Sequence, residues 1–263
     1  MNTPLDRYLA MLPRNPAGGG MVEQSAIIWD HLLTLQSTDN LAGDMAEIGV
    51  FRGFGASLMA GYLRPDESLI LVDKFCDLEY SSEAISEVAG PAVLERTIFH
   101  QVDSTILARR GNLAPGKELR YFHIDGEHSY DGVVTDLKLA IASLAPHGIV
   151  VVDDFFSPAS AAITQAVFDF AGDQTNGVAL FLVGYNKAYL CLNRWLGHYR
   201  RAISTLPDVL EKRGHLVQLA AGGFAHERTY AGISARASEN KYQLIGKFIG
   251  GVDEFLSPVN RYP

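Results

Sequence analysis

The sequence predicts an α/β protein with a doubly wound, Rossmann-like sheet of seven strands. Short apolar runs alternate with helical segments, and most runs are apolar at successive positions, which is typical of parallel strands buried on both faces. Only Gly184–Lys187 separates the last two runs. That gap is too short for a helical crossover, so we expect an antiparallel hairpin there. The seven runs are Met45–Val50, Leu69–Val72, Ile98–Val102, Tyr121–Ile124, Ile149–Val152, Val178–Val183 and Ala188–Leu192.

Helical spacing marks two further elements. Apolar residues recur from Val22 to Leu33, which predicts an amphipathic cap helix over residues 21–37. A second stripe, from Val133 to Leu144, predicts a helix between the fourth and fifth strands. Residues 1–20 are rich in proline and glycine and are expected to form an arm or linker.

After residue 193 the strand pattern stops. Residues 195–213 have a helical pattern and residues 214–236 a mixed one. The predicted organisation is an N-terminal arm and cap helix over 1–40, a ligand-binding domain over 41–193 and a C-terminal extension over 194–263. Glycine hinges and apolar anchors at 248–258 make that segment a candidate lid or dimer arm.

Composition excludes several classes of protein. The 263 residues include 22 Lys+Arg and 30 Asp+Glu, a net charge of −8, which argues against general nucleic-acid binding. The longest aliphatic run, Ile149–Val152, is far shorter than the roughly 20 residues that span a bilayer. Two cysteines cannot make a disulfide framework. We expect a soluble, cytoplasmic protein with no nucleic-acid or membrane partner.

A glycine-rich turn follows the first strand. Glu47–Gly55 has the spacing E-x-G-x-x-x-G-x-G, in which Gly49 and Gly53 let the backbone approach a ligand closely. The carboxylate before the first glycine suits a positively charged ligand group better than a pyrophosphate. Asp73 ends the second strand, where a carboxylate can hold a ribose diol. Asp103 and Ser104 end the third strand beside the same crevice, although such residues also cap helices.

In combination these motifs resemble the class I S-adenosylmethionine-dependent methyltransferases, over about residues 40–192. The resemblance implies a seven-stranded sheet whose last strand is antiparallel. It also implies that Glu47 and Gly49 lie near the methionine part of the cofactor and Asp73 on the ribose hydroxyls, with Gly53 also among the cofactor-binding residues. Asp103 and Ser104 would lie near adenine, with Asp125 also beside the cofactor.

Acidic residues follow the fourth and fifth strands. Asp125 ends one strand, and Asp153 and Asp154 end the next. Neighbouring strand ends would crowd these carboxylates together, and crowded carboxylates repel one another unless a cation intervenes. Oxygen ligands favour Mg²⁺, Mn²⁺ or Ca²⁺. The alternative is that the three aspartates cap the helices that follow.

The string from Ile124 to Tyr130, followed by a helix and the paired aspartates, resembles a metal-dependent O-methyltransferase group. Its members include natural-product sugar and macrolide-sugar methyltransferases. The resemblance implies that Asp125, Asp153 and Asp154 bind Mg²⁺ or Mn²⁺, and that His128 or Glu127 is the base. We favour His128 because a neutral imidazole accepts a proton near pH 7. His123, within the strand, is expected to be structural.

The predicted function is methyl transfer from S-adenosylmethionine to a hydroxyl of a sugar-like or natural-product acceptor, by a monomer or homo-oligomer. Three alternatives stay open. They are a metal-independent O- or N-methyltransferase, a cofactor-binding protein without catalysis, and a nicotinamide dehydrogenase. The last is disfavoured because the chain lacks G-x-G-x-x-G after the first strand.

Overall fold

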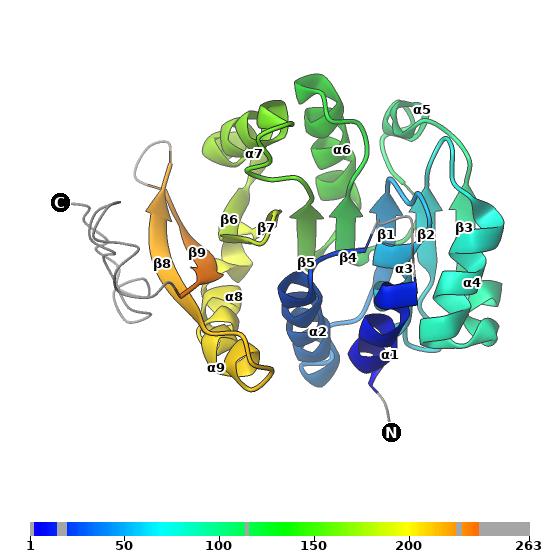
Figure 1. Cartoon of the computed structure of the whole chain (residues 1–263). Helices are drawn as coiled ribbons and strands as arrows, with labels where there is room; N and C mark the ends of the chain where they lie inside the picture. The colour runs from blue at the N-terminus through cyan, green and yellow to red at the C-terminus, as the bar shows by residue number, and fades with distance from the viewer. Residues whose placement is uncertain (1–2, 15–19, 114–115, 225–227, 237–263) are drawn as a thin grey trace.

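A mixed β-sheet runs through the molecule, with helices on both of its faces (Figure 1). The structure, a computed structural model, describes residues 3–14, 20–113, 116–224 and 228–236. Within these residues the sheet has nine strands in the order β3-β2-β1-β4-β5-β7-β6-β9-β8. Neighbouring strands are parallel except where β7 or β8 takes part. The strands are β1 Asp44–Ile48, β2 Leu69–Val72, β3 Thr97–His100, β4 Leu119–Ile124, β5 Leu144–Val152, β6 Val178–Gly184, β7 Lys187–Leu192, β8 Val217–Gly223 and β9 Thr229–Ala235.

All seven predicted strands are present, and the predicted hairpin is confirmed as β6 and β7. Its two central residues, Tyr185 and Asn186, have φ of 51° and 67°. Positive φ at both positions is what a type I′ turn requires, and that turn matches the twist of the flanking strands.

The expectation that the strands stop at residue 193 is wrong. Strands β8 and β9 pair with each other along seven residues, and β9 joins β6 through Leu182 and Val183. Alanine and glycine are frequent in both strands, so their β-propensity is weak. Pairing with an existing edge, rather than local preference, therefore decides their conformation.

The helices form two layers that bury alternate residues of the strands. One layer packs against Met45 and Leu71, the other against Ala46 and Val72. The first layer holds α1 Pro4–Met11, α2 Glu23–Thr38, α3 Phe54–Ala60, α4 Leu78–Ala89, α8 Leu196–Ile203 and α9 Leu206–Glu211. The second holds α5 Ser104–Ala108, α6 Tyr130–Ser143 and α7 Ala161–Gly172. None of the described helices is both long and apolar enough to cross a membrane.

Helix α1 corrects the prediction of an arm at the N-terminus. The Thr3 hydroxyl accepts the Asp6 backbone N–H while the Asp6 carboxylate accepts that of Thr3, a capping box that begins the helix. Leu5 and Tyr8 are fully buried against the rest of the layer. Residues 15–19 of the predicted arm lie outside the described residues, as does the candidate lid at 248–258. The cap helix predicted over 21–37 is confirmed as α2.

Four parallel strands end in register at one edge of the sheet. The last residues pair as Ile48 with Val72, Ile48 with Ile124, and Ile124 with Val152. Strand order reverses between β1 and β4, which is the place where open α/β sheets bind ligands. The residues that come next in the four strands are Gly49, Asp73, Asp125 and Asp153.

Candidate functional site

A cleft of about 490 Å³ lies at this edge, over the ends of β1, β2 and β4. Most of the residues predicted to bind a cofactor line it together. They are Gly49, Asp73, Asp103, Ser104 and Asp125, with Glu127 beside them. The structure therefore brings the separate motifs to one cavity.

The backbone of the glycine-rich turn requires both glycines that the sequence singled out. Gly49 has φ +83°, and a Cβ there would lie 1.7 Å from the backbone oxygen of Asp125. Gly53 has φ +74° and precedes α3, and its Cβ would lie 2.9 Å from the Cα of Ser81. A side chain at either position would push the turn away from its neighbours.

Asp73 holds the same turn in place. Its Oδ2 accepts the backbone N–H groups of Val50 and Phe51, both at 2.8 Å, and its Oδ1 accepts that of Phe75 at 2.6 Å. The carboxylate thus shapes the cleft that it lines. Its contact with a ribose stays a prediction.

Asp103 and Ser104 stand where the third strand leads into α5. Asp103 caps this short helix by accepting the backbone N–H of Thr105 at 3.0 Å, and its carboxylate lies 3.6 Å from the ammonium of Lys74. The hydrogen bonds from Thr105 lower the pKa of Asp103. The capping role is therefore present, and an adenine contact stays a prediction.

Glu47 is buried rather than exposed in the cleft. Its Oε1 lies 2.7 Å from Nδ1 of His123, and a Cβ on Gly55 would come within 2.1 Å of that oxygen. Burial raises the pKa of Glu47, and the interaction with His123 only partly offsets this rise. For His123, burial alone would lower the pKa, but Asp153 and Glu47 outweigh burial and raise it to about 9. His123 is buried, as the sequence indicated. The proximity of Glu47 to methionine stays a prediction.

A buried lysine that the sequence reasoning missed faces Asp153. The ammonium of Lys187 lies 2.6 Å from Oδ2 of Asp153 and 5.5 Å from the ring centre of Trp29. Burial raises the pKa of Asp153, but the imidazole of His123, whose Nε2 lies 3.7 Å from Oδ2, and the charge of Lys187 lower it overall. Asp153 as a metal ligand stays a prediction, and in this structure its carboxylate pairs with an internal cation.

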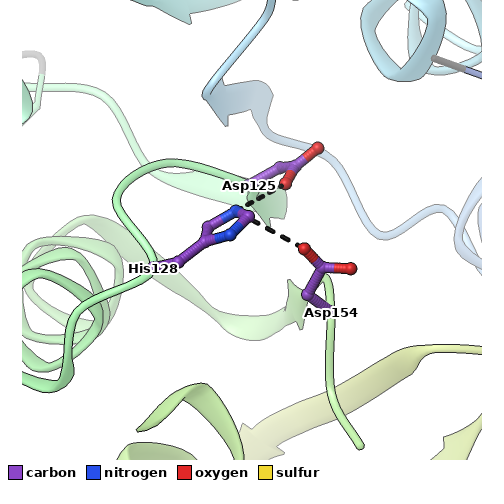
Figure 2. Close-up of side chains that lie close together, drawn as sticks. All are labelled: Asp125, His128 and Asp154. Carbon is purple, nitrogen blue, oxygen red and sulfur yellow. Dashed lines mark ion pairs between the residues drawn. The ribbon is translucent and has the colours of Figure 1, made fainter. Parts of the chain in front are cut away.

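Asp125, His128 and Asp154 form a cluster (Figure 2). The Nε2 atom of His128 lies 3.7 Å from Oδ1 of Asp125 and 3.5 Å from Oδ2 of Asp154. One ligand atom from each residue lies within 4.8 Å of the others. Partial burial raises the pKa of Asp125 to about 6, and the negative charge of Asp153 contributes to this rise.

The loop after β5 is fixed where it presents Asp154. This residue has φ 54°, a left-handed conformation that costs free energy in a residue other than glycine. Nδ2 of Asn186, in the β6–β7 turn, donates to Oδ1 of Asp154 at 2.7 Å. Oδ1 of Asp153 accepts the Asp154 backbone N–H at 2.8 Å. These hydrogen bonds with Asn186 and Asp153 hold Asp154 toward His128.

The two candidate bases occupy different places. His128 stands in the cluster, and its Nδ1 lies 3.4 Å from the hydroxyl of Ser160. Glu127 is exposed and lines the cleft instead. The geometry groups His128 with the two aspartates, and which residue acts as base stays a prediction.

Asp136 on α6 is a buried acid behind the cleft that the sequence reasoning also missed. Among the described residues neither of its carboxylate oxygens has a hydrogen-bond partner. A Cβ on Gly126, which lines the cleft, would lie 2.9 Å from Oδ2 of Asp136. Burial raises the pKa of Asp136 to about 6, with the hydroxyl of Ser104 acting in the opposite direction.

Comparison with known proteins gives a family match for the centre of the chain. A family described as "Methyltransferase domain" matches residues 46–155, which run from β1 through the cluster to the loop after β5. A search of curated proteins gives no match.

Solved structures show the same fold. The O-methyltransferase TomG from Streptomyces achromogenes, in complex with S-adenosylmethionine, is 18% identical over 73% of this chain and 90% of its own, with a TM-score of 0.52. PaMTH1 from Podospora anserina, bound to S-adenosylhomocysteine, is 14% identical over 72% and 87%, with a TM-score of 0.53. CalS11, a TDP-rhamnose 3′-O-methyltransferase of calicheamicin biosynthesis, is 16% identical over 72% and 93%, with a TM-score of 0.51.

Replacing the buried acid by an amide is expected to stabilise the fold at alkaline pH. The folded pKa of Asp136, about 6, exceeds the unfolded value of about 3.9, so its neutral form is favoured by folding. The contribution of protonated Asp136 to the free energy of unfolding is therefore fully present below the unfolded pKa and is lost as pH rises through the folded pKa. Asp136→Asn should raise the free energy of unfolding by about 1 to 3 kcal/mol at pH 8, and by less at pH 5. Urea denaturation at both pH values measures this.

The matched control is Asp131→Asn, an exposed acid in the first turn of the same helix. Loss of its interaction with the helix N-terminus should lower the free energy of unfolding by no more than about 1 kcal/mol, at both pH values. An Asp136→Asn protein that is no more stable than the wild type at pH 8 would contradict the assignment.

Proposed function

We propose that this chain, which carries a methyltransferase domain at residues 46–155, transfers a methyl group from S-adenosylmethionine to a hydroxyl of a small molecule with the help of a divalent cation. The observation that carries the proposal is the position of Asp125. It lines the cofactor-sized cleft and is also part of the cluster with His128 and Asp154. Donor and acceptor would meet at this residue.

The cleft suits the proposed methyl donor. Its volume of about 490 Å³ is in the range of small-molecule sites. Among the described residues, four acids line it against one cation, Lys74, which favours a ligand that carries a sulfonium and an ammonium group. The fold relatives TomG and PaMTH1 were solved with this cofactor or its product, which supports the choice.

The cluster suits a divalent cation held by Asp125 and Asp154. Carboxylate oxygens are donors that Mg²⁺ or Mn²⁺ accepts, and one oxygen from each of the two aspartates lies within 4.8 Å of the other and of a His128 ring nitrogen. When bound, the ion would orient the acceptor and lower the pKa of its hydroxyl. We assign Asp153 a supporting role instead, because Lys187 already balances its charge.

His128 then takes the proton of the acceptor hydroxyl. Its Nε2 faces the cluster, while Nδ1–H can donate to the Ser160 hydroxyl, 3.4 Å away. The hydroxyl oxygen forms a bond to the methyl carbon as the bond from that carbon to sulfur breaks, leaving neutral S-adenosylhomocysteine. The protein mainly supplies alignment and proton acceptance, because the sulfonium is already a reactive donor.

A metal-independent methyltransferase is the second candidate, and Lys187 is the observation that favours it. Its buried ammonium gives the site a positive charge without any ion. In that case His128 or Glu127 would act alone, and chelators would leave turnover unchanged.

Cofactor binding is the first test of the proposed function. S-adenosylhomocysteine should bind with micromolar affinity, about −8 kcal/mol, in isothermal titration calorimetry. Asp73→Ala should weaken binding by roughly 1.5 to 3 kcal/mol, because the carboxylate lines the cleft and holds the glycine-rich turn. The control Asp66→Ala removes an exposed acid outside the cleft and should change nothing. No heat with the wild type, or equal affinity for Asp73→Ala, would refute the cofactor assignment.

The base is tested by comparing two variants on a vicinal-diol acceptor in the presence of Mg²⁺. His128→Ala should lower kcat by about 10² to 10⁴ and leave S-adenosylhomocysteine affinity nearly unchanged, because the imidazole lies in the cluster and not in the cleft. Glu127→Gln should cost much less. Excess EDTA should abolish wild-type turnover, and Mg²⁺ or Mn²⁺ should restore it. If Glu127→Gln is the more damaged enzyme, His128 is not the base.

A further inference from the structure

A second hollow, of about 440 Å³, lies beside the cluster and shares no lining residue with the cofactor cleft. Three segments that are distant in sequence surround it. Phe155 and Phe156 come from the loop after β5, Tyr185 and Asn186 from the β6–β7 turn, and Tyr230 from the β8–β9 ribbon. The ribbon lies beyond residues 46–155, so the hollow depends on a part of the chain that the family match does not include.

The hollow is tied directly to the cluster. Asn186 lines it, and the side-chain amide of Asn186 donates to Asp154 at 2.7 Å. Phe155, which also lines it, is the next residue in the chain after Asp154. A molecule in this hollow would therefore have one end at the cluster.

The walls of the hollow carry no formal charge. Among the described residues no Asp, Glu, Lys, Arg or His lines it, and the side-chain polar groups are those of Asn186, Ser234 and two tyrosines. The remaining lining is aromatic, aliphatic or glycine. Such walls favour an uncharged ligand with extended apolar surface over a nucleotide sugar, because no cation is present to meet a diphosphate.

Aromatic rings fix the shape of one wall. The ring centres of Phe155 and Phe156 lie 4.3 Å apart, and Phe168 on α7 lies 5.2 Å from Phe155 and 6.0 Å from Tyr230. Phe156 has φ 67°, an unusual backbone conformation for a bulky residue. The residue is 54% exposed. Its backbone N–H donates to the hydroxyl of Thr164 at 2.9 Å, which holds the ring at the rim.

From these contacts we propose that the hollow binds the acceptor, and that the acceptor is a flat, uncharged aromatic ring system that carries the reacting hydroxyl. This inference rests on the proposed function and names its substrate class. The ring lies against Phe156 and Tyr230, and its hydroxyl reaches Asp125 and His128 in the cluster. The phenolic proton passes to His128 as the oxygen forms its bond to the methyl carbon and the carbon–sulfur bond breaks.

Two neutral vicinal diols separate this proposal from a sugar acceptor. The probes are 2,3-dihydroxynaphthalene and methyl α-mannopyranoside, titrated into the full chain by calorimetry in EDTA, so that metal chelation contributes to neither. The naphthalene diol should bind at least tenfold more tightly. Phe156→Ala should weaken its binding about 3- to 10-fold, the scale of one aromatic contact. Ile98→Ala, at the opposite edge of the sheet and also exposed, should leave binding unchanged.

S-adenosylhomocysteine is titrated into the same samples, which keeps the two proposals distinguishable. Equal or tighter binding of the mannoside, no binding of either diol, or an unaffected Phe156→Ala protein would overturn the aromatic acceptor even where the cofactor product binds. Loss of S-adenosylhomocysteine binding alone would instead overturn the proposed function, while the diol titrations would still establish the ligand class of the hollow.

Discussion

Four parallel strands end in register at one edge of the sheet, and this register decides which side chains can meet. Because Ile48, Ile124 and Val152 are matched across β1, β4 and β5, the residues after them leave the sheet at the same level. A slip of one residue would turn each strand's side chains to the opposite layer. Gly49 would then no longer face the backbone of Asp125, a contact so close that only glycine fits.

Charge balance follows from that register. Strand ends at one level bring Asp125, Asp153 and Asp154 into a small space, and their charges need compensation. The protein supplies it for Asp153 through Lys187 and His123. Asp125 and Asp154 face the imidazole of His128 instead, at 3.7 and 3.5 Å. The charge of Asp153 is thus compensated by residues of the protein itself, whereas the charges of Asp125 and Asp154 could be compensated by a bound cation. For this reason we place the ion between Asp125 and Asp154.

Much of the fold could be predicted from the sequence because it depends on local patterns. Continuous apolar runs predicted the seven strands, and the four-residue gap Gly184–Lys187 predicted the hairpin. Helix α1 was missed because the prolines and glycines of residues 1–20 resemble those of a linker, although Pro4 suits the first turn of a helix. Strands β8 and β9 carry little local signal because pairing decides their conformation.

The site shows the same division. Strand-end residues such as Asp73 and Asp125 were found because topology alone brings them together. Lys187, Asn186 and Asp136 could not be found in this way, since their importance depends on what faces them in three dimensions. Lys187 directly precedes the apolar run of β7, which was the one available signal of a buried charge.

The central claim is that the methyl donor and the cation share one site at Asp125, and a magnetic measurement tests it most directly. S-adenosylmethionine labelled with ¹³C in its methyl group is bound to the protein, and its NMR signal is recorded with Mg²⁺ and then with paramagnetic Mn²⁺. We predict that Mn²⁺ broadens the methyl signal strongly and that Asp154→Asn removes this broadening while the cofactor stays bound. A bound methyl signal of equal width with Mn²⁺ and Mg²⁺ would contradict the shared site.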